Sequence, residues 1–406
     1  MKAFNIEELR LVAKRRLPRA VFNFIDGGAE DERSLRDNCA AFGRLRLSPK
    51  MLVDVSDIQT RTLILGNESK LPLAIAPTGA VGFGWPGGDL AIARAAAAAG
   101  IPYSLSMSAT TSIERIAEKA PGRLWFQAYF LKQRDYTFGL IERARAAGYE
   151  ALIVTADVPV GGKCERDYRT DFTVPFRYTP KNLFDFATHP AWALQQLRHG
   201  MPKLVNLAGV APEARSTSAL ASSVARSNDP TLDWEVLKVV RERWPGKLMV
   251  KGILRADDAE RAVALGCEGV IVSNHGGRQL ESAVATLDAL PPIARAVGSK
   301  ASVLLDGGVR RGGDAFKALA LGAQAVMTGR ATLYGACAAG DAGAQRALDI
   351  LADELVRTMQ LCGCQRIDQI GPEFLFSDAD AALVEKLEGD GAALAAHRRP
   401  HLVGDR

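Results

Sequence analysis

Residues 302–330 of the chain read SVLLDGGVRRGGDAFKALALGAQAVMTGR, and this segment contains the repeating unit from which the fold can be predicted. A short apolar run, Ser302–Asp306, leads through a glycine-rich loop into an alanine-rich amphipathic segment, Gly313–Leu321. Gly322 follows that segment, as a glycine that ends a helix does, and precedes a second apolar run, Ala325–Thr328. The order predicts strand, helix, strand, and a crossover helix makes the two strands parallel.

The same unit recurs along the chain. Short apolar runs bounded by Gly, Pro or polar residues are typical of buried parallel strands. The predicted strands are Leu71–Ala76, Ile101–Leu105, Leu124–Tyr129, Ala151–Asp157, Leu248–Lys251, Gly269–Ser273, Ser302–Asp306 and Ala325–Thr328. The predicted helices between them include Asp89–Ala99, Ser112–Ala120, Asp135–Ala147, Asp257–Leu265 and Gly313–Leu321. Eight such units predict an α/β protein with a (β/α)8 TIM barrel. A doubly wound open sheet is the alternative, disfavoured because no GxGxxG motif follows the first strand.

One gap breaks the rhythm of strands and helices. About 90 residues separate the fourth and fifth predicted strands, and the extra segment, 176–230, follows the end of a strand. Because barrel enzymes carry their sites at that end, we expect this long loop on the active-site face, as a lid, a docking surface or a disordered segment. Residues 1–375 are expected to form one domain that begins with a helical extension, 1–65, and 376–406 a C-terminal tail.

Composition excludes several classes of protein. The 48% hydrophobic content supports a large core, and a net charge of +5 over 406 residues is too small to indicate a nucleic-acid partner. The first 20 residues carry charge in every turn, unlike a signal peptide, and no run of 18 apolar residues predicts a transmembrane helix. The six cysteines form no CxxC pair, so we expect reduced cytosolic thiols and no metal site.

Polar residues with catalytic chemistry follow two of the strands. His275 lies in the glycine-rich loop after the sixth strand, where an imidazole can act as a base; the alternative is a histidine that caps a turn. Asp157 ends the fourth strand on the same face as Thr155, and a protonated histidine would be a suitable partner for its charge. The alternative for Asp157 is a helix N-cap.

Glycine-rich loops after the last two strands predict a phosphate site. Gly307, Gly308 and Arg310 follow the seventh strand, and Gly329 and Arg330 follow the eighth. Glycines let backbone N–H groups approach a phosphate, a following helix N-terminus favours the anion, and barrel phosphate sites use these two loops. Lys251, at the end of the fifth strand, predicts a fixed anion or an electron-rich ring edge, or else has a structural role.

Several motifs together resemble one family. The strings SNHGGRQL, DGGVRRGGDAFKALALGA, TGRATLYG and LPRAVFNFIDGGAEDERSL, with WFQAY at 125–129 and VKG at 250–252, are similar to the FMN-dependent 2-hydroxy acid oxidases and dehydrogenases. That family includes glycolate oxidase, flavocytochrome b2, L-lactate dehydrogenase and (S)-mandelate dehydrogenase. The likeness runs from about residue 4 to 375, and THPAWAL at 188–194 is most similar to bacterial quinone-linked lactate and mandelate dehydrogenases.

The resemblance implies FMN as cofactor, oxidation of an (S)-2-hydroxy acid to a 2-oxo acid, and a homotetramer. It implies that His275 is the catalytic base, that Asp157 stabilises the imidazolium, and that Arg278 and Tyr129 bind the substrate. Lys251 would lie beside the N1–C2 carbonyl edge of the flavin. The residues implied to line the flavin are Pro77, Thr78, Gly79, Ser106, Gln127, Thr155 and Ser273. Those implied to hold its ribityl chain and phosphate are Asp306, Gly307, Gly308, Arg310, Gly329 and Arg330.

Three positions depart from the family pattern. Phe24 stands where a substrate-binding tyrosine is usual, Cys164 replaces a second active-site arginine, and Ser108 aligns with a tryptophan of glycolate oxidase. Ser108 and Gly79 leave space, which favours a bulky or aromatic, mandelate-like substrate over glycolate. Arg166 or Lys163 could replace the missing arginine.

Other functions stay open at this point. An L-lactate dehydrogenase and an oxygen-using oxidase are alternatives, as is a different FMN barrel such as a dihydroorotate dehydrogenase, which the pair His275 and Arg278 argues against. A flavin-binding protein with degraded catalysis is the alternative of another class. The aromatic and basic segment 176–207 predicts contact with a membrane surface or a quinone, so the protein would be cytosolic or peripheral on the inner face of the cell membrane.

Overall fold

Eight parallel strands close into a barrel in the order β10-β3-β4-β5-β6-β7-β8-β9. The structure is a computed structural model that describes residues 2–170, 179–208 and 228–376. The barrel strands are β3 (Leu73–Thr78), β4 (Tyr103–Ser106), β5 (Leu124–Ala128), β6 (Ala151–Thr155), β7 (Lys247–Ile253), β8 (Gly269–Val272), β9 (Ser302–Leu305) and β10 (Ala325–Thr328). The predicted (β/α)8 barrel is confirmed, and pairing of β10 with β3 rules out the open sheet.

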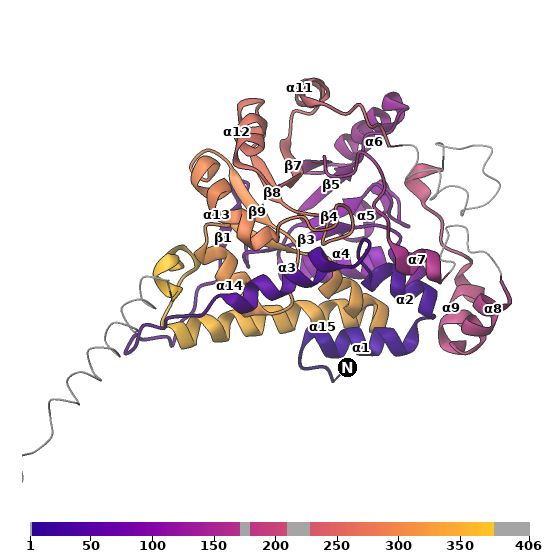
Figure 1. The fold of residues 1–406 in the computed structure, drawn as a ribbon, viewed down its shortest axis with the longest axis horizontal. Helices are drawn as coiled ribbons and strands as arrows, with labels where there is room; N and C mark the ends of the chain where they lie inside the picture. Colours follow the sequence, from indigo (N-terminus) through magenta and orange to yellow (C-terminus); the bar gives the residue numbers. More distant parts are fainter. Residues whose placement is uncertain (1, 171–178, 209–227, 377–406) are drawn as a thin grey trace, which may run out of the picture.

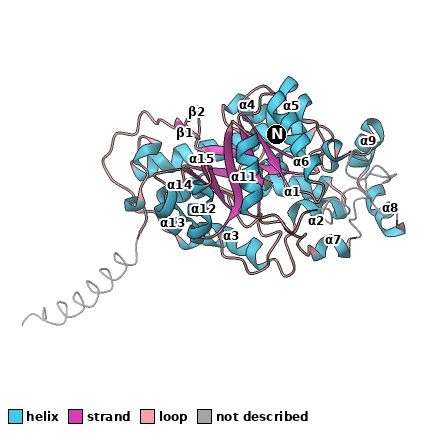
Figure 2. Ribbon diagram, turned by 90° about the horizontal axis from the view of Figure 1, so that it is seen from above, coloured by secondary structure: helices cyan, strands magenta, loops and turns pink. Residues whose placement is uncertain are grey.

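Helices surround the barrel in both ribbon views (Figures 1 and 2). The helices that follow barrel strands are α4 (Gly88–Ala99), α5 (Ile113–Lys119), α6 (Arg134–Ala146), α11 (Trp234–Arg243), α12 (Ala256–Ala264), α13 (Thr286–Val297), α14 (Gly312–Ala320) and α15 (Arg330–Cys362). Each predicted helix matches one of them to within about two residues, and Gly100 ends α4 in the left-handed conformation, at φ 64°. Short 3-10 turns are η1 (Val81–Phe83), η2 (Val205–Leu207), η3 (Ile367–Gln369) and η4 (Pro372–Phe374).

The N-terminal extension contains helices α1 (Ile6–Arg16), α2 (Arg19–Asp26) and α3 (Arg33–Arg44), but it is not wholly helical. The prediction of helix up to residue 65 is wrong at its end, where β1 (Thr62–Ile64) pairs with β2 (Asn67–Ser69) in a hairpin. Ile64 and Leu65 at the hairpin turn are buried with the residues inside the barrel. The hairpin therefore closes the end of the barrel opposite the site, a tertiary role that three-residue strands do not reveal in sequence.

The inside of the barrel has two layers, because alternate residues of each strand point inward. The lower layer is apolar and buried, and it includes Ala76, Trp125, Ile153, Met249, Ile271, Leu304 and Met327. Two residues further along the same strands are Thr78, Gln127, Thr155, Lys251, Ser273, Asp306 and Gly329. The polar residues Gln127, Thr155, Lys251, Ser273 and Asp306 thus stand one step above the apolar layer. Tyr129 and Asp157, which were also predicted on strands, follow the ends of β5 and β6 one step further along.

The segment between β6 and β7 holds α7 (Glu165–Arg169), α8 (Pro180–Ala187) and α9 (Pro190–His199), at the right of Figure 1. The α9 helix is docked by Trp192, whose indole Nε1 donates to the Phe83 carbonyl at 2.8 Å, and by Gln196, which donates to the Gly82 carbonyl at 3.3 Å. Residues 171–178 and 209–227 of this segment and the tail beyond residue 376 lie outside the described residues.

Candidate active site

A cavity of about 490 Å³ opens at the carboxyl ends of the barrel strands. This volume is in the range of small-molecule sites. Of the residues singled out in the sequence, the cavity is lined by Phe24, Pro77, Thr78, Gly79, Ser106, Ser108, Tyr129, Cys164, Lys251, His275, Arg278, Asp306, Gly307, Gly308, Arg310, Gly329 and Arg330. Gln127, Thr155 and Ser273 are buried behind that lining, and Asp157 lies behind His275.

His275 forms the centre of the site. Its Nδ1 lies 2.9 Å from Oδ1 of Asp157, and its Nε2 lies 3.4 Å from the hydroxyl of Tyr129. When the neutral ring donates from Nδ1 to the carboxylate, the lone pair of Nε2 faces the cavity, as a base requires. Burial opposes the charge of Asp157, but its interactions with His275 and Lys251 outweigh burial and lower the pKa of that carboxyl. Burial raises the pKa of Tyr129 to about 12, so its phenol stays neutral.

Glycines hold this arrangement where chain segments meet. His275 itself has φ 58°, and Gly276 and Gly277 continue the left-handed turn at φ 62° and 74°. A Cβ on Gly277 would lie 2.4 Å from the backbone nitrogen of Leu35. Gly252, at φ 104°, lets Asp157 cross the end of β7, since a Cβ there would lie 2.6 Å from the Asp157 Cβ. Both glycines are therefore required by close approach as well as by φ.

Arg278 is fixed by the end of helix α2. Its Nη1 donates to the carbonyl oxygens of Phe24 at 2.7 Å and Gly27 at 2.8 Å, and its guanidinium lies 5.2 Å from the centre of the Phe24 ring. Within the described residues, neither Nε nor Nη2 of Arg278 donates a hydrogen bond, and Nη2 lies 3.7 Å from Oδ2 of Asp167. One edge of the guanidinium is thus available to a carboxylate, which arginine binds through two parallel hydrogen bonds.

Arg330 braces the same helix end from the other side. Its three nitrogens donate to the carbonyl oxygens of Ile25, Gly276 and Gly27, at 3.2, 2.8 and 2.8 Å. Burial lowers the pKa of Arg330 to about 10, so the side chain remains charged at neutral pH. The sequence predicted that Arg330 is a cation of the phosphate site. It did not predict the three carbonyl contacts, because these depend on how α2 folds over the barrel.

The polar layer contains two hydrogen-bonded groups. Gln127 donates to Thr155 at 3.0 Å and accepts from Ser106 at 3.1 Å. Nζ of the buried Lys251 donates to Ser273 at 2.8 Å and lies 3.3 Å from Oδ2 of Asp306. Burial disfavours the lysine cation, but Asp306 and Asp157 outweigh it and raise the pKa of Lys251. The site therefore holds a permanent buried cation at its floor.

Sequence comparison identifies the family. Residues 13–377 match the model of the FMN-dependent dehydrogenase family. The chain belongs to this family. It is 43% identical to (S)-mandelate dehydrogenase of Pseudomonas putida, over 96% of this chain and 98% of the relative, and 43% identical to L-lactate oxidase of Nostoc sp., over 91% and 97%. It is also 40% identical to a putative L-lactate dehydrogenase of Mycobacterium tuberculosis, over 91% and 88%.

Solved structures agree with the sequence comparison. The crystal structure of the monotopic membrane protein (S)-mandelate dehydrogenase superimposes with a TM-score of 0.88 at 43% identity, covering 93% of this chain and 100% of that one. Mandelate oxidase with (S)-4-hydroxymandelic acid superimposes at 0.81 and 37% identity, covering 92% and 98%. The protein is accordingly an FMN-dependent oxidoreductase that acts on 2-hydroxy acids.

The residues present fit FMN. Oδ1 of Asp306 is buried and has no hydrogen-bond partner among the described residues, as expected of an acceptor kept for a ligand. Gly307 and Gly308 have φ 98° and 81°, and a Cβ on Gly308 would lie 2.0 Å from the Asn38 carbonyl oxygen. This glycine loop, in which the phosphate site was predicted, thus packs against the backbone of α3 so closely that only glycine fits.

The two helices that follow the glycine loops differ at their N-termini. The amides of Arg310 and Arg311 before α14 both donate to Asp314 at 2.9 Å, and that of Gly312 donates to Glu354 at 2.8 Å. Helix α15 begins at Arg330 with Gly329 as its N-cap, and both residues line the cavity. The N-terminus of α15 is therefore the one available to a phosphate.

The structure corrects the suggested replacement for the missing arginine. Arg166 lies away from the cavity, where it binds Asp26 at 3.0 Å and also pairs with Glu32. Lys163 is exposed and pairs with Glu165 at 3.1 Å. Neither cation therefore takes the position of the missing arginine beside Cys164. Buried carboxylates stabilise the charge of Arg166, and solvent stabilises that of Lys163.

Asp167 and Leu204 are among the cavity residues that sequence reasoning missed. Asp167 lines the cavity beside Cys164 and Arg278, although its setting among Glu165 and Arg166 is typical of a solvated helix turn. Leu204, from the segment after α9, is buried and closes another part of the wall. Both residues reach the cavity only because the long segment folds back over the barrel, which the sequence does not show. The one local signal for Leu204 is that it is an apolar residue directly before a 3-10 turn.

Proposed function

We propose that the protein oxidises an (S)-2-hydroxy acid with a bulky, aromatic side chain, mandelate-like in shape, to the 2-oxo acid. FMN, when bound, accepts the two electrons of this oxidation. The observation that carries the proposal is the placement of His275, paired with Asp157, beside the available edge of Arg278 in one cavity. The relatives named mandelate dehydrogenase and mandelate oxidase support the aromatic side chain.

The chain's own residues divide the work between binding and proton transfer. The guanidinium of Arg278 binds the substrate carboxylate and fixes its orientation. Nε2 of His275 removes a proton from the substrate, and Asp157 stabilises the imidazolium that forms. The neutral hydroxyl of Tyr129, 3.4 Å from that Nε2, contacts the substrate oxygen.

The cavity wall near Arg278 favours an apolar substituent. Phe24 contributes a ring where a hydroxyl would otherwise donate, and Cys164 contributes a buried thiol whose pKa is raised by burial. Ser108, with a small side chain, and Gly79, with none, also line the cavity, and a Cβ on Gly79 would lie only 3.0 Å from Cβ of Ser108. Burying an aryl group here would contribute about 25 cal/mol per Å² of apolar area.

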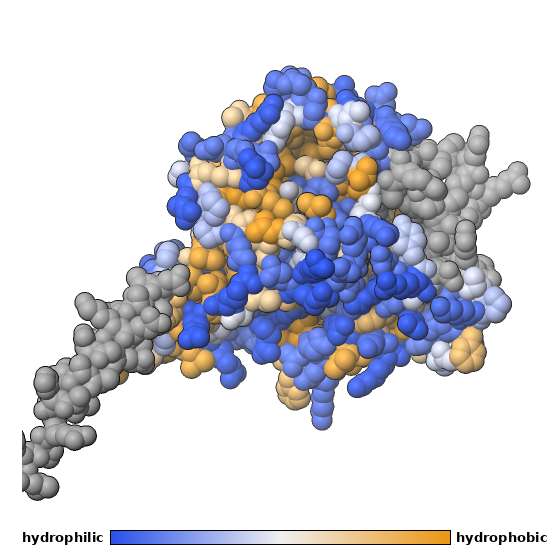
Figure 3. All heavy atoms as spheres, in the orientation of Figure 1, coloured by the Kyte–Doolittle hydropathy of each residue, from blue (hydrophilic) through white to orange (hydrophobic). Residues whose placement is uncertain are grey.

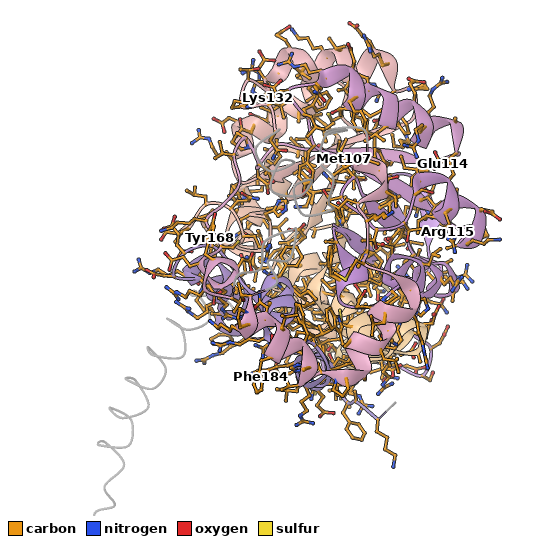
Figure 4. All side chains as sticks on the ribbon, turned by 90° about the vertical axis from the view of Figure 1, so that its right-hand side faces the viewer. Met107, Glu114, Arg115, Lys132, Tyr168 and Phe184 are labelled. Atoms are coloured by element: carbon orange, nitrogen blue, oxygen red, sulfur yellow. The ribbon has the colours of Figure 1, made fainter. Side chains whose placement is uncertain are left out.

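The α8–α9 pair carries an exposed apolar surface, to which we assign a membrane contact near the electron acceptor, a quinone. We call this set the outer surface: Leu183, Phe184, Leu194, Leu197, Met201 and Val205, with exposed fractions from 37% to 81%. Figure 4 turns this pair toward the viewer and labels Phe184, and Figure 3 shows an apolar group projecting at the lower right, where Figure 1 places the pair. Lys181, Arg198 and Lys203 are exposed beside it, as anionic headgroups require.

Membrane contact here would be peripheral. Across the described ranges, no helix is both long enough and apolar enough to span a bilayer. The buried residues of α9, Trp192 and Gln196, face the barrel and leave the opposite face outward. A short amphipathic pair of this kind lies in the plane of the interface.

The direct test is anaerobic bleaching of the yellow holoprotein by a panel of 2-hydroxy acids. We expect (S)-mandelate and phenyllactate to reduce the flavin faster than lactate or glycolate. A tenfold or greater preference for lactate or glycolate would overturn the aromatic assignment. Failure of every 2-hydroxy acid to bleach the flavin would favour an FMN-binding protein without turnover.

A further inference from the structure

Asp167 is a cavity residue to which the catalytic scheme above gives no role. It lies on α7, three residues after Cys164, and its side chain is 17% exposed. It lines the same cavity wall as Cys164 and Arg278. A carboxylate at this position faces the region in which the substrate carboxylate must bind.

This carboxylate lacks the hydrogen bonds that an anion needs. Oδ1 is buried and has no hydrogen-bond partner in the part of the chain that the structure describes. Oδ2 lies 3.7 Å from Nη2 of Arg278, beyond hydrogen-bond distance. By contrast, Asp26 at the end of α2 is bound by Arg10, Arg166 and Tyr334, and its pKa is lowered to about 2.

The charges around Asp167 do not compensate for its burial. Arg278 faces it from the loop after β8, but the guanidinium is shared with two backbone carbonyl oxygens. Arg166, on the same helix, is committed to Asp26 and Glu32, and Glu32 itself disfavours a second negative charge. Burial consequently raises the pKa of Asp167 to about 6, despite the opposing charges of Arg278 and Arg166.

We infer that Asp167, as a neutral acid, donates a hydrogen bond to the substrate carboxylate and binds it together with Arg278. The inference rests on the proposed function, in which Arg278 holds that carboxylate. An ionised Asp167 would place two carboxylates on one guanidinium, whereas a neutral one leaves a single negative charge and supplies the missing donor. Asp167 thereby occupies the role left open by Cys164, and substrate binding above pH 6 takes up one proton.

The test uses the FMN-loaded full chain and benzoate, an aryl carboxylate that cannot be oxidised. Its dissociation constant is measured from the change in flavin absorbance between pH 5 and 8. Because the neutral form binds, we expect the Kd to rise by roughly tenfold per pH unit above about pH 6. Since His275 faces the same cavity, each comparison is repeated in a His275→Asn background, where the remaining pH dependence belongs to Asp167.

Three variants separate the effect of protonating Asp167 from the effect of its side chain as a hydrogen-bond donor. Asp167→Asn keeps a donor without titrating, so its Kd should stay flat and near the low-pH value of the unaltered protein. Asp167→Leu should be flat at a weaker Kd at every pH. Glu165→Gln removes a charge from the same helix, at a residue paired with Lys163 and Arg169, and should leave the wild-type profile unchanged.

Two outcomes would overturn the inference. One is that the Kd of Asp167→Asn depends on pH in the same way as that of the unaltered protein. The other is that the holoprotein does not bind benzoate at pH 5 and that Asp167→Asn binds it no better. Failure of the proposed function is a separate result, because benzoate binding needs no turnover. A protein with the predicted benzoate profile that no 2-hydroxy acid bleaches would refute the oxidation and support the role of Asp167.

Discussion

Nδ1 of His275 and Oδ1 of Asp157 lie 2.9 Å apart, although 118 positions separate the two residues in the chain. Asp157 follows β6 and His275 follows β8, so the pair reaches across the end of the intervening strand β7. Gly252 makes the crossing possible, because its missing side chain leaves the space that Asp157 occupies. The proton acceptor of the proposed reaction is therefore built by three strands together.

Replacement of His275 by Ala should abolish reduction of the flavin by substrate while FMN remains bound. A general base contributes about 10²- to 10⁴-fold, and the loss should appear in the reduction rate measured by anaerobic stopped-flow. Asp157→Asn should slow the same step less, because the base remains and only its cationic form loses a partner. Since the pKa of Asp157 is lowered, its contribution should persist through neutral pH and fade only as the solution becomes strongly acidic. Wild-type reduction by the Ala variant would rule out His275 as the base.

Gly252→Ala should slow reduction by moving Asp157 rather than by removing any reacting group. The new Cβ would lie 2.6 Å from Cβ of Asp157, and a non-glycine residue at φ 104° costs on the order of 1–3 kcal/mol. We expect a lower reduction rate and a lower Tm with FMN still bound. Gly313→Ala is the matched control, because a Cβ there meets only Thr358 at 3.6 Å. Equal rates in the two variants would contradict the crossing argument.

Arg330→Ala should weaken FMN binding. A charge-assisted hydrogen bond to phosphate is worth roughly 1.5–3 kcal/mol, which corresponds to a Kd higher by roughly 10- to 150-fold. Equilibrium titration of the apoprotein with FMN measures this change, and Arg330→Lys tests whether charge alone suffices. Arg311→Ala, in the adjacent loop, should leave the Kd unchanged, because that side chain pairs with Glu354 outside the cavity. If the Kd of Arg330→Ala for FMN is unaltered, Arg330 does not bind the phosphate and only stabilises the end of helix α2.

Phe24→Tyr combined with Cys164→Arg should shift preference toward small 2-hydroxy acids. The two changes add a hydroxyl and a guanidinium beside Arg278, where each hydrogen bond to a carboxylate contributes about 1.5–3 kcal/mol. The ratio of kcat/KM for mandelate over lactate should fall by about tenfold or more. A ratio that stays constant would show that these two positions do not determine specificity.

Leu197→Glu should reduce recovery of the protein with sedimenting liposomes. Leu197 is 81% exposed on the outer surface of α9, and withdrawing one leucine from a membrane removes about 1.5–3 kcal/mol. Leu361→Glu is the control, since Leu361 is 70% exposed on α15, away from the α8–α9 pair. Equal recovery of both variants and the unaltered chain would remove the membrane role.

The local pattern of apolar and polar residues was enough to predict the barrel and to place the site at the carboxyl ends of its strands. The strands around Thr155, Lys251 and Asp306 are apolar runs with one polar residue at the inward position nearest the carboxyl end, and that alternation is a property of neighbouring residues. The glycines at 307–308 and 276–277 were also visible, since their effect on the backbone is local. His275 was a candidate base from its glycine-rich loop, whereas the role of Arg278 was implied only by the family resemblance.

Tertiary structure decided which charges face the cavity. Arg166 and Asp167 are adjacent in sequence, yet Arg166 turns to Asp26 and Glu32 while Asp167 enters the cavity. The same holds for the β1–β2 hairpin, which is stable only because it covers the end of the barrel. A side chain's burial and partners depend on segments far away in the chain. Sequence therefore predicted the fold and the proposed catalytic residues, and packing determined how they are supported.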